Sequence, residues 1–84
     1  MSYLVFILPH AQKELAELPT RPFGRIRDAI RRLAECPRPS GGLKLTGREG
    51  CRLRVGDYRV VYEITDEIRI VRINRVRHRR DVYR

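Results

Sequence analysis

Three arginines are spaced so that they could form a phosphate-binding site. Arg52 and Arg54 alternate with apolar residues, and Arg59 stands near the start of the next run of β-branched and aromatic residues. The Gly-Asp pair between these two runs is typical of a two-residue hairpin turn, which would pair Arg54 with Arg59. Paired and alternate residues of a strand project to the same face, so the three side chains should cluster. Like charges at this spacing are unfavourable without an anion, and the pattern therefore predicts a site for phosphate.

The C-terminal tail brings more cations together with two groups that can transfer protons. Its cations are Arg77, Arg79 and Arg80, and its proton-transfer groups are the imidazole of His78 and the phenol of Tyr83. We expect these side chains and the three strand arginines to face one anion-binding pocket on the open side of a sheet. A lone histidine is a weak indicator of function, so the interpretation depends on its neighbours.

The overall charge favours a polyanionic partner. The 84 residues carry 19 Lys and Arg against 10 Asp and Glu, a net charge of +9. Lys13 and Lys44 are the two lysines, so 17 of these cations are arginines, whose planar fork matches phosphate oxygens. Residues 42–84 carry 12 of the cations and 6 of the acids. The alternative is a basic domain whose arginines are merely solvated.

Several other classes of protein are disfavoured. Two cysteines, Cys36 and Cys51, are too few for a disulfide scaffold, and a nucleophilic role for Cys51 lacks a visible base. The Cys, His, Asp and Glu residues show no metal-ligand spacing, so no metal or cofactor is expected. The apolar run 3–8 is too short for a signal or membrane helix. We expect one cytoplasmic domain over residues 1–84 with no membrane partner.

Hydrophobic periodicity predicts a strand, two helices and then three strands. The expected strands span 3–8, 51–55, 58–64 and 68–76, and the expected helices span 9–18 and 22–36. Thr20 is expected to cap the second helix, and Asp66-Glu67 to form a tight turn. The fold class is therefore α+β, in the order β-α-α-β-β-β. A helical hairpin would pack on one face of a small antiparallel sheet and leave the other face open.

The same residues carry a family resemblance. The run from Arg52 to Ile64 resembles the R-L-R-V-G-D-Y-R-V-x-Y-E-I signature of RelE/ParE-type toxins. The run from Arg75 to Arg84 is similar to their R-V-G-H-R-R-[DE]-V-Y-R ending, and Lys44-Leu45-Thr46-Gly47 is similar to their K-L-x-G. The chain is thus identified as a RelE-like member of the RelE/ParE superfamily, with the RelE-like fold.

The resemblance implies a toxin of a type II toxin–antitoxin module. RelE-like members enter the ribosomal A site and cleave the mRNA there without metal, by attack of a ribose 2′-hydroxyl on the adjacent phosphate. This chemistry needs removal of a proton, stabilisation of a dianionic phosphorane and protonation of the leaving oxygen. The implied partners are an acidic cognate antitoxin, the ribosome with its mRNA, and operator DNA through the antitoxin.

The resemblance also implies roles for individual residues. Arg59 would clamp the scissile phosphate, and Tyr83 would contact the 2′-hydroxyl or stack on a base. His78 or Arg79 would transfer protons, and His78 is favoured because its ordinary pKa lies nearest neutrality. The expected RNA-binding residues are Lys44, Arg52, Arg54, Arg77 and Arg80.

The sequence departs from the family pattern at two positions and leaves two alternatives open. Cys51 replaces an aromatic residue found in many relatives, and Arg77 replaces a glycine. One alternative is a ParE-like toxin that inhibits DNA gyrase and is not an enzyme. The other is a regulatory member that binds the antitoxin and operator DNA without catalysis.

Overall fold

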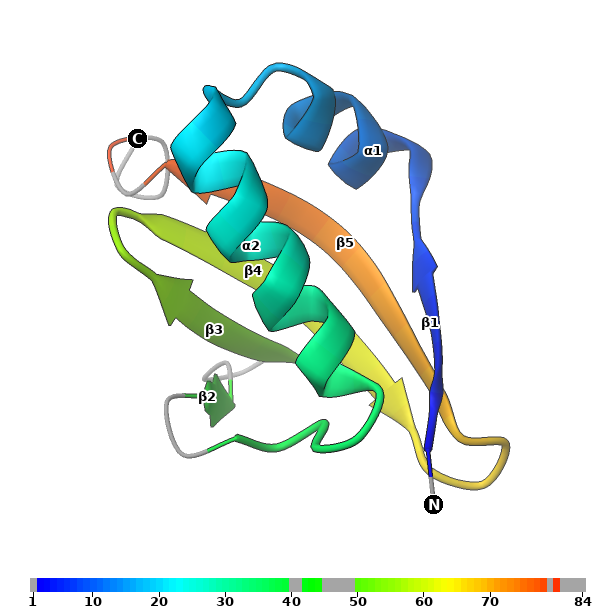
Figure 1. Ribbon diagram of the computed structural model, residues 1–84. Coiled ribbons are helices and arrows are strands. Elements are labelled where there is room, and N and C mark those ends of the chain that lie inside the picture. Colours follow the sequence, from blue (N-terminus) through cyan, green and yellow to red (C-terminus); the bar gives the residue numbers. More distant parts are fainter. Residues whose placement is uncertain (1, 40–41, 45–49, 79, 81–84) are drawn as a thin grey trace.

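The computed structural model describes residues 2–39, 42–44, 50–78 and 80, and for Gly42–Lys44 it describes the backbone alone. Two helices and five strands follow one another in this part of the chain (Figure 1). The elements are β1 (Leu4–Ile7), α1 (Pro9–Ala16), α2 (Thr20–Leu33), β2 (Gly42–Lys44), β3 (Cys51–Val55), β4 (Tyr58–Thr65) and β5 (Ile70–His78). The predicted α+β fold is confirmed, with the short strand β2 as an addition.

The five strands form one sheet in the order β1-β5-β4-β3-β2. Strands β2 to β5 pair antiparallel, as expected, but β1 pairs with β5 in parallel, so the sheet is mixed. Parallel neighbours need a long crossover, and here the crossover begins with the two helices. Figure 1 shows both helices on one side of the sheet, and in the described part of the chain no helix covers the other face, which we call the open face.

The core lies between the helices and the sheet. Helix α2 contributes Ile26, Ile30 and Leu33, all buried, from the stripe that its sequence predicts. Tyr62 of β4 is fully buried beneath it, and its hydroxyl donates to the carbonyl of Pro37 at 2.9 Å. Burial raises the pKa of the Tyr62 phenol to about 12. This tyrosine therefore ties the segment that leaves α2 to the middle of the sheet.

Helix α1 covers the edge of β5 beyond the end of β1. The carboxylate of Glu14 accepts the backbone N–H of Val76 at 2.8 Å. It also accepts the guanidinium of Arg75 at 3.1 and 3.0 Å, and this partner raises the pKa of Arg75. The Glu14 side chain thus binds a backbone N–H at the β5 edge that would otherwise need a neighbouring strand.

Element ends differ from the prediction by up to three residues, as at α2, which ends at Leu33 and not at Cys36, and two other local details also differ. Pro19 stands at the N-cap of α2 and Thr20 is the first helical residue, without a capping bond from its side chain. The turn between β4 and β5 spans residues 66–69 in place of two residues, because Arg69 adopts a φ of 53° and its N–H donates to the Asp66 carbonyl. The last strand therefore begins two residues later than expected, at Ile70.

Asp66 links three distant parts of the chain. It accepts the hydroxyl of Tyr3 at 2.7 Å and both terminal nitrogens of Arg38 at 3.1 and 2.8 Å. These donors lower the pKa of the Asp66 carboxyl to about 2. The start of β1, the segment after α2 and the β4–β5 turn are thereby joined at one end of the sheet.

Candidate functional site

Three arginines lie abreast on the three central strands of the sheet. Arg54 of β3 pairs with Arg59 of β4, and Arg59 pairs with Arg77 of β5. We call these residues the arginine row. Directly opposed residues have Cβ atoms about 5 Å apart, so the three guanidiniums start from closely spaced anchors.

The arginine row faces the open side of the sheet. Its immediate neighbours Leu53, Val60 and Val76 are buried against the helices, and successive residues of a strand point to opposite faces. Arg52 shares the face of Arg54 by the same alternation. The predicted hairpin register and the predicted common face of Arg52, Arg54 and Arg59 are therefore confirmed.

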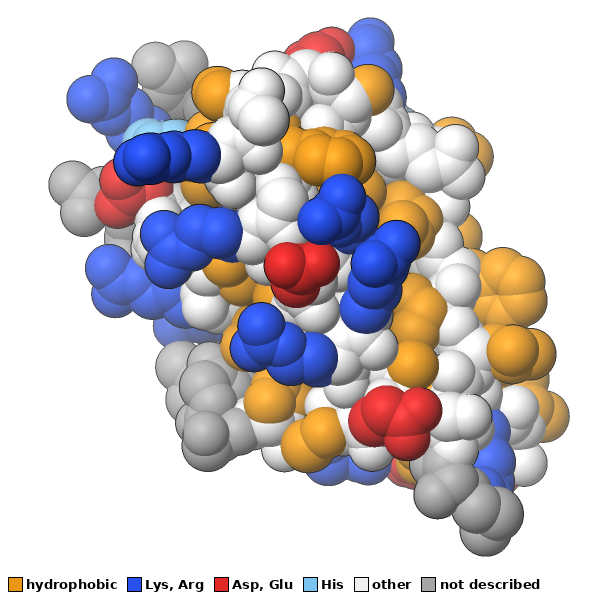
Figure 2. Space-filling view, viewed as in Figure 1, with side chains coloured by type: hydrophobic (Ala, Val, Ile, Leu, Met, Phe, Trp, Pro, Cys, Tyr) orange, Lys and Arg blue, Asp and Glu red, His pale blue; other side chains and the backbone are white. Residues whose placement is uncertain are grey.

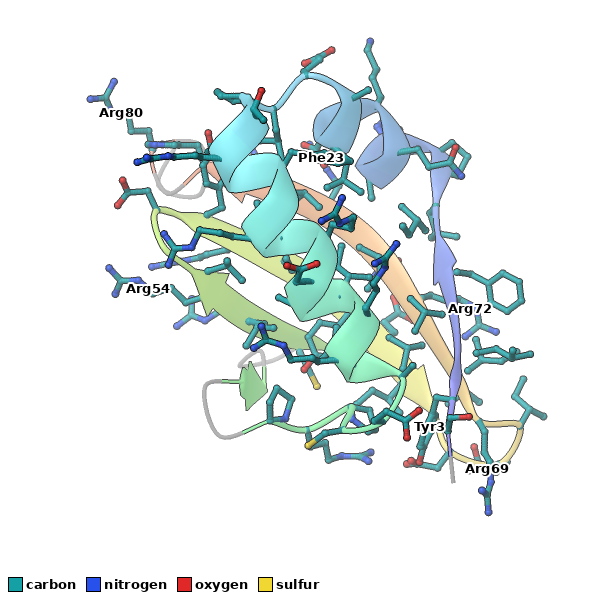
Figure 3. The ribbon with its side chains drawn as sticks, in the orientation of Figure 1. Tyr3, Phe23, Arg54, Arg69, Arg72 and Arg80 are labelled. Carbon is teal, nitrogen blue, oxygen red and sulfur yellow. The ribbon has the colours of Figure 1, made fainter. Side chains whose placement is uncertain are left out.

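The exposure of the row suits it to binding a large anion. Arg54 is exposed at the edge of β3, where its Nε donates to the carbonyl of Gly56 at 3.3 Å (Figure 3). Arg59 and Arg77 are half-buried. A phosphate placed over the middle strand could be approached by donors from both sides, and partial burial weakens the screening of those contacts by water.

His78 does not lie with these arginines. It pairs with Tyr58, and the two rings meet edge to face with centroids 5.1 Å apart. Tyr58 shares the face of Val60, so the imidazole is on the helix side of the sheet, where its Nδ1 accepts the backbone N–H of Arg80 at 3.2 Å. The expectation that the imidazole faces the same pocket as the strand arginines is wrong.

The β4–β5 pairing explains that error. A bulge at Val61 and Tyr62 shifts the register by one residue, and without it Arg59 would face Val76. The extra residue lies in β5, between Ile73 and Arg75, and each β5 side chain after it therefore points to the opposite face from the one it would otherwise take. The bulge therefore brings Arg77 beside Arg59 and sends His78 to the opposite side.

The remaining candidate residues are placed less completely. Arg79 and Tyr83 lie outside the described residues, and for Lys44 the backbone alone is described, paired with Cys51. Arg80 is exposed just beyond β5, with its side chain pointing away from the body of the protein (Figure 3). The proposed roles of Arg79, Tyr83 and Lys44 stay predictions.

A second basic feature escaped the sequence reasoning. A cleft of about 430 Å³ lies between α2 and the edge of β3, and Arg25, Arg32 and Arg54 line it. The sequence placed the α2 arginines off the apolar stripe, but it held no signal for which strand they would face. Among the described residues, no group of three His, Cys, Asp or Glu is arranged to hold a metal ion. Neither described helix is long and apolar enough to cross a membrane.

A helical hairpin packed on a small sheet, with arginines on three adjacent strands, defines a class of small basic α+β domains. Within that class, residues 5–83 match the family model described as the ParE toxin of the type II toxin–antitoxin system parDE. The chain belongs to this toxin family, within the RelE/ParE superfamily. None of the curated protein sequences compared with the chain matches it.

Solved structures of RelE proteins share the fold. A chain of the toxin–antitoxin complex RelBE2 from Mycobacterium tuberculosis is 30% identical, with a TM-score of 0.84, and the match covers 93% of this chain and 99% of that one. A chain of the RelE–RelB complex from Pyrococcus horikoshii is 29% identical, with a TM-score of 0.84 and coverages of 94% and 97%. A free variant of the Escherichia coli toxin RelE is 25% identical, with a TM-score of 0.79 and coverages of 99% and 92%.

Proposed function

We propose that this toxin is a ribosome-dependent endonuclease that cleaves mRNA in the A site. The observation that supports this activity most directly is the arginine row, in which Arg54, Arg59 and Arg77 come from three adjacent strands on the open face. The similarity to RelE structures over nearly the whole chain adds support.

The row suits the charge that develops during metal-free cleavage. Attack of the 2′-hydroxyl on the neighbouring phosphate produces a phosphorane with two negative charges, and the bond to the 5′ oxygen then breaks. Arg59, in the middle of the row, would contact the phosphate, while Arg54 and Arg77 would approach it from either side. The sheet holds the backbone of the three arginines in register, so little backbone movement is needed as this charge forms, which is where electrostatic catalysis gains most.

Proton transfer falls to the end of the chain in this proposal. Tyr83 and Arg79 are the candidates that the family resemblance supplies. The imidazole of His78 lies across the sheet from the row and contacts Tyr58, so a structural role at the end of β5 fits it better.

The test is cleavage of mRNA on programmed ribosomes. We expect Arg59→Ala to lower the cleavage rate by about 10²- to 10³-fold, because it removes the central phosphate contact. Arg69→Ala is the matched control: Arg69 is exposed in the β4–β5 turn, at the far end of the sheet from Arg54 (Figure 3), and its loss should change the rate less than about twofold. Intact mRNA after incubation with the wild-type toxin would refute the activity.

His78→Ala tests whether His78 transfers protons during cleavage or only packs against Tyr58. We expect it to keep cleavage within about tenfold of wild type, because a proton-transfer group typically contributes 10²- to 10⁴-fold. A larger loss with unchanged thermal stability would return His78 to the catalytic set.

A second candidate function is inhibition of DNA gyrase without catalysis. It is favoured by the family model, whose description names the ParE toxin. Supercoiling of plasmid DNA by purified gyrase distinguishes the two: the nuclease proposal expects no effect of this protein, and the ParE-like function expects inhibition.

The partners follow from the same comparisons. The matched structures from Mycobacterium tuberculosis and Pyrococcus horikoshii each hold a toxin in complex with its antitoxin, and a toxin of this family needs a neutralising partner. We propose a cognate antitoxin that is acidic, because the toxin carries a net charge of +9. The cytoplasm is the compartment in which the proposed ribosomal target resides.

A further inference from the structure

The open face of the sheet carries a carboxylate among its cations. Glu63 of β4 is the only Asp or Glu in the strands that the structure describes, whose other charged residues are all Lys or Arg. On the helix side, by contrast, acidic and basic side chains lie next to one another over α2 (Figure 2), as in the ion pair of Arg27 with Asp28. A carboxylate on an otherwise basic face therefore needs an explanation of its own.

Glu63 lies on the same face as the arginine row, further along β4. Val60 and Tyr62 of this strand are buried on the helix side. Since successive residues alternate, Val61 and Glu63 share the open face with Arg59. A strand rises about 3.3 Å per residue, which puts the backbone of Glu63 about 13 Å from that of Arg59. An RNA strand bound to Arg59 through one phosphate would therefore bring a neighbouring nucleotide, and not the same phosphate, to Glu63.

The carboxylate of Glu63 is held in place by a neutral partner. Its Oε1 accepts the side-chain amide of Asn74 at 2.8 Å, and both residues are half-buried. Arg72 is the cross-strand neighbour of Glu63, but its guanidinium donates to the hydroxyl of Thr65 at 2.9 Å. In the described part of the chain, Glu63 forms no ion pair. Its second oxygen can thus accept a donor from a ligand.

A carboxylate at this position would repel phosphate and attract N–H donors. An ionised carboxylate only accepts hydrogen bonds, and its two oxygens can accept from two donors side by side. Of the RNA bases, guanine is the one that presents two adjacent N–H donors, N1–H and the N2 amino group, on its Watson–Crick edge. The bases of single-stranded RNA expose this edge to proteins. The chemistry of the site therefore favours guanine over the other bases.

We propose that Glu63 binds a guanine of the A-site codon and thereby determines the sequence preference of cleavage. Arg59 would hold the scissile phosphate, and Arg52, which pairs with Val61 between the two sites, would hold the intervening backbone. Asn74 is a positioning residue in this arrangement, because its amide fixes the orientation of the Glu63 carboxylate. The inference rests on the proposed nuclease activity and adds the base that the toxin prefers.

The test measures cleavage rates on ribosomes programmed with mRNAs that differ only in the A-site codon. We expect the wild-type toxin to cleave codons with guanine at one position at least about tenfold faster than codons with another base there, a factor typical of one bidentate contact to a base. Glu63→Gln keeps the shape of the side chain but replaces an acceptor with a donor, and it should reduce this ratio to less than about threefold. Glu67→Gln is the matched control, because it removes the same charge from an exposed residue of the β4–β5 turn and should leave the ratio unchanged.

Two further measurements separate base recognition from a structural role of the pair. Inosine in place of guanine removes the N2 amino group without any change in the protein, and it should slow cleavage by the wild-type toxin at least about fivefold. Asn74→Ala should lower the guanine ratio, because it removes the donor that orients Glu63. A purely structural role would instead slow cleavage at every codon by the same factor, together with a loss of thermal stability.

Each outcome decides the proposal. Equal codon ratios for the wild type and Glu63→Gln, equal rates on guanine and inosine, or a wild-type toxin without a guanine preference would overturn the base contact and leave the nuclease activity intact. Failure of the wild-type toxin to cleave any codon would overturn the nuclease activity and the base contact together. Circular dichroism would establish that the variants are folded, and the inosine measurement needs no variant.

Discussion

At the residue scale, one position along β5 separates a candidate phosphate ligand from a packing residue. Arg77 and His78 are neighbours in a basic tail, yet Arg77 pairs with Arg59 on the open face and His78 meets Tyr58 on the helix side. The bulge in the β4–β5 ladder sets this division, because each residue inserted in a strand exchanges the faces of those that follow. Residue type alone therefore did not identify the members of the site.

Glu14 provides a prediction at this scale. Its carboxylate joins α1 to the β5 edge through Val76 and Arg75, so Glu14→Ala should lower the free energy of unfolding by about 2 kcal/mol. Glu17→Ala is the control, because Glu17 is exposed on the same short segment and should cost less than about 0.5 kcal/mol. Urea denaturation followed by circular dichroism measures both, and equal losses would show that the β5 edge does not depend on Glu14.

At the scale of elements, the β3–β4 hairpin presents two members of the arginine row, and α2 forms one wall of the cleft beside β3. The hairpin turn has a positive φ of 59° at Gly56 and none at Asp57, which fits a type II′ turn. Helix α2 also contains a glycine, Gly24, where an added Cβ would meet nothing within 4 Å. Gly56 therefore has a backbone conformation that favours glycine, whereas Gly24 has an ordinary helical one.

Alanine substitutions at these glycines should have opposite effects. Gly56→Ala should destabilise the protein by about 1–2 kcal/mol, because alanine is strained at that φ. Gly24→Ala should stabilise it by about 1 kcal/mol, because alanine loses less backbone entropy in a helix. Thermal melting of the two variants gives the signs directly, and two shifts in the same direction would contradict this account.

At the scale of the whole molecule, basic residues lie on both sides of one small sheet, and Arg54 at the edge of β3 belongs to both surfaces. The arginine row occupies the open face, and the cleft between α2 and β3 lies on the helix side. With a net charge of +9, both surfaces attract polyanions over several ångströms, and local shape decides which partner binds where.

The charge predicts how antitoxin binding responds to salt. Raising the salt concentration from about 0.1 M to about 1 M shortens the Debye length from about 10 Å to about 3 Å. We expect the association rate to fall by about tenfold or more, while the dissociation rate changes less than about threefold. Surface plasmon resonance separates the two rates, and a response carried entirely by dissociation would argue against long-range attraction.

The sequence by itself determined the order of the two helices and of every strand but β2, the β3–β4 register, and the common face of Arg52, Arg54 and Arg59. These features follow from local periodicity and from a two-residue turn, so no distant contact is needed to specify them. Tertiary structure alone decided the parallel pairing of β1, the contact of Glu14 with β5, the bulge that brings Arg77 to the arginine row, and the cleft between α2 and β3. Each of these depends on how segments far apart in the chain pack together, and the spacing of residues along the chain does not predict that packing.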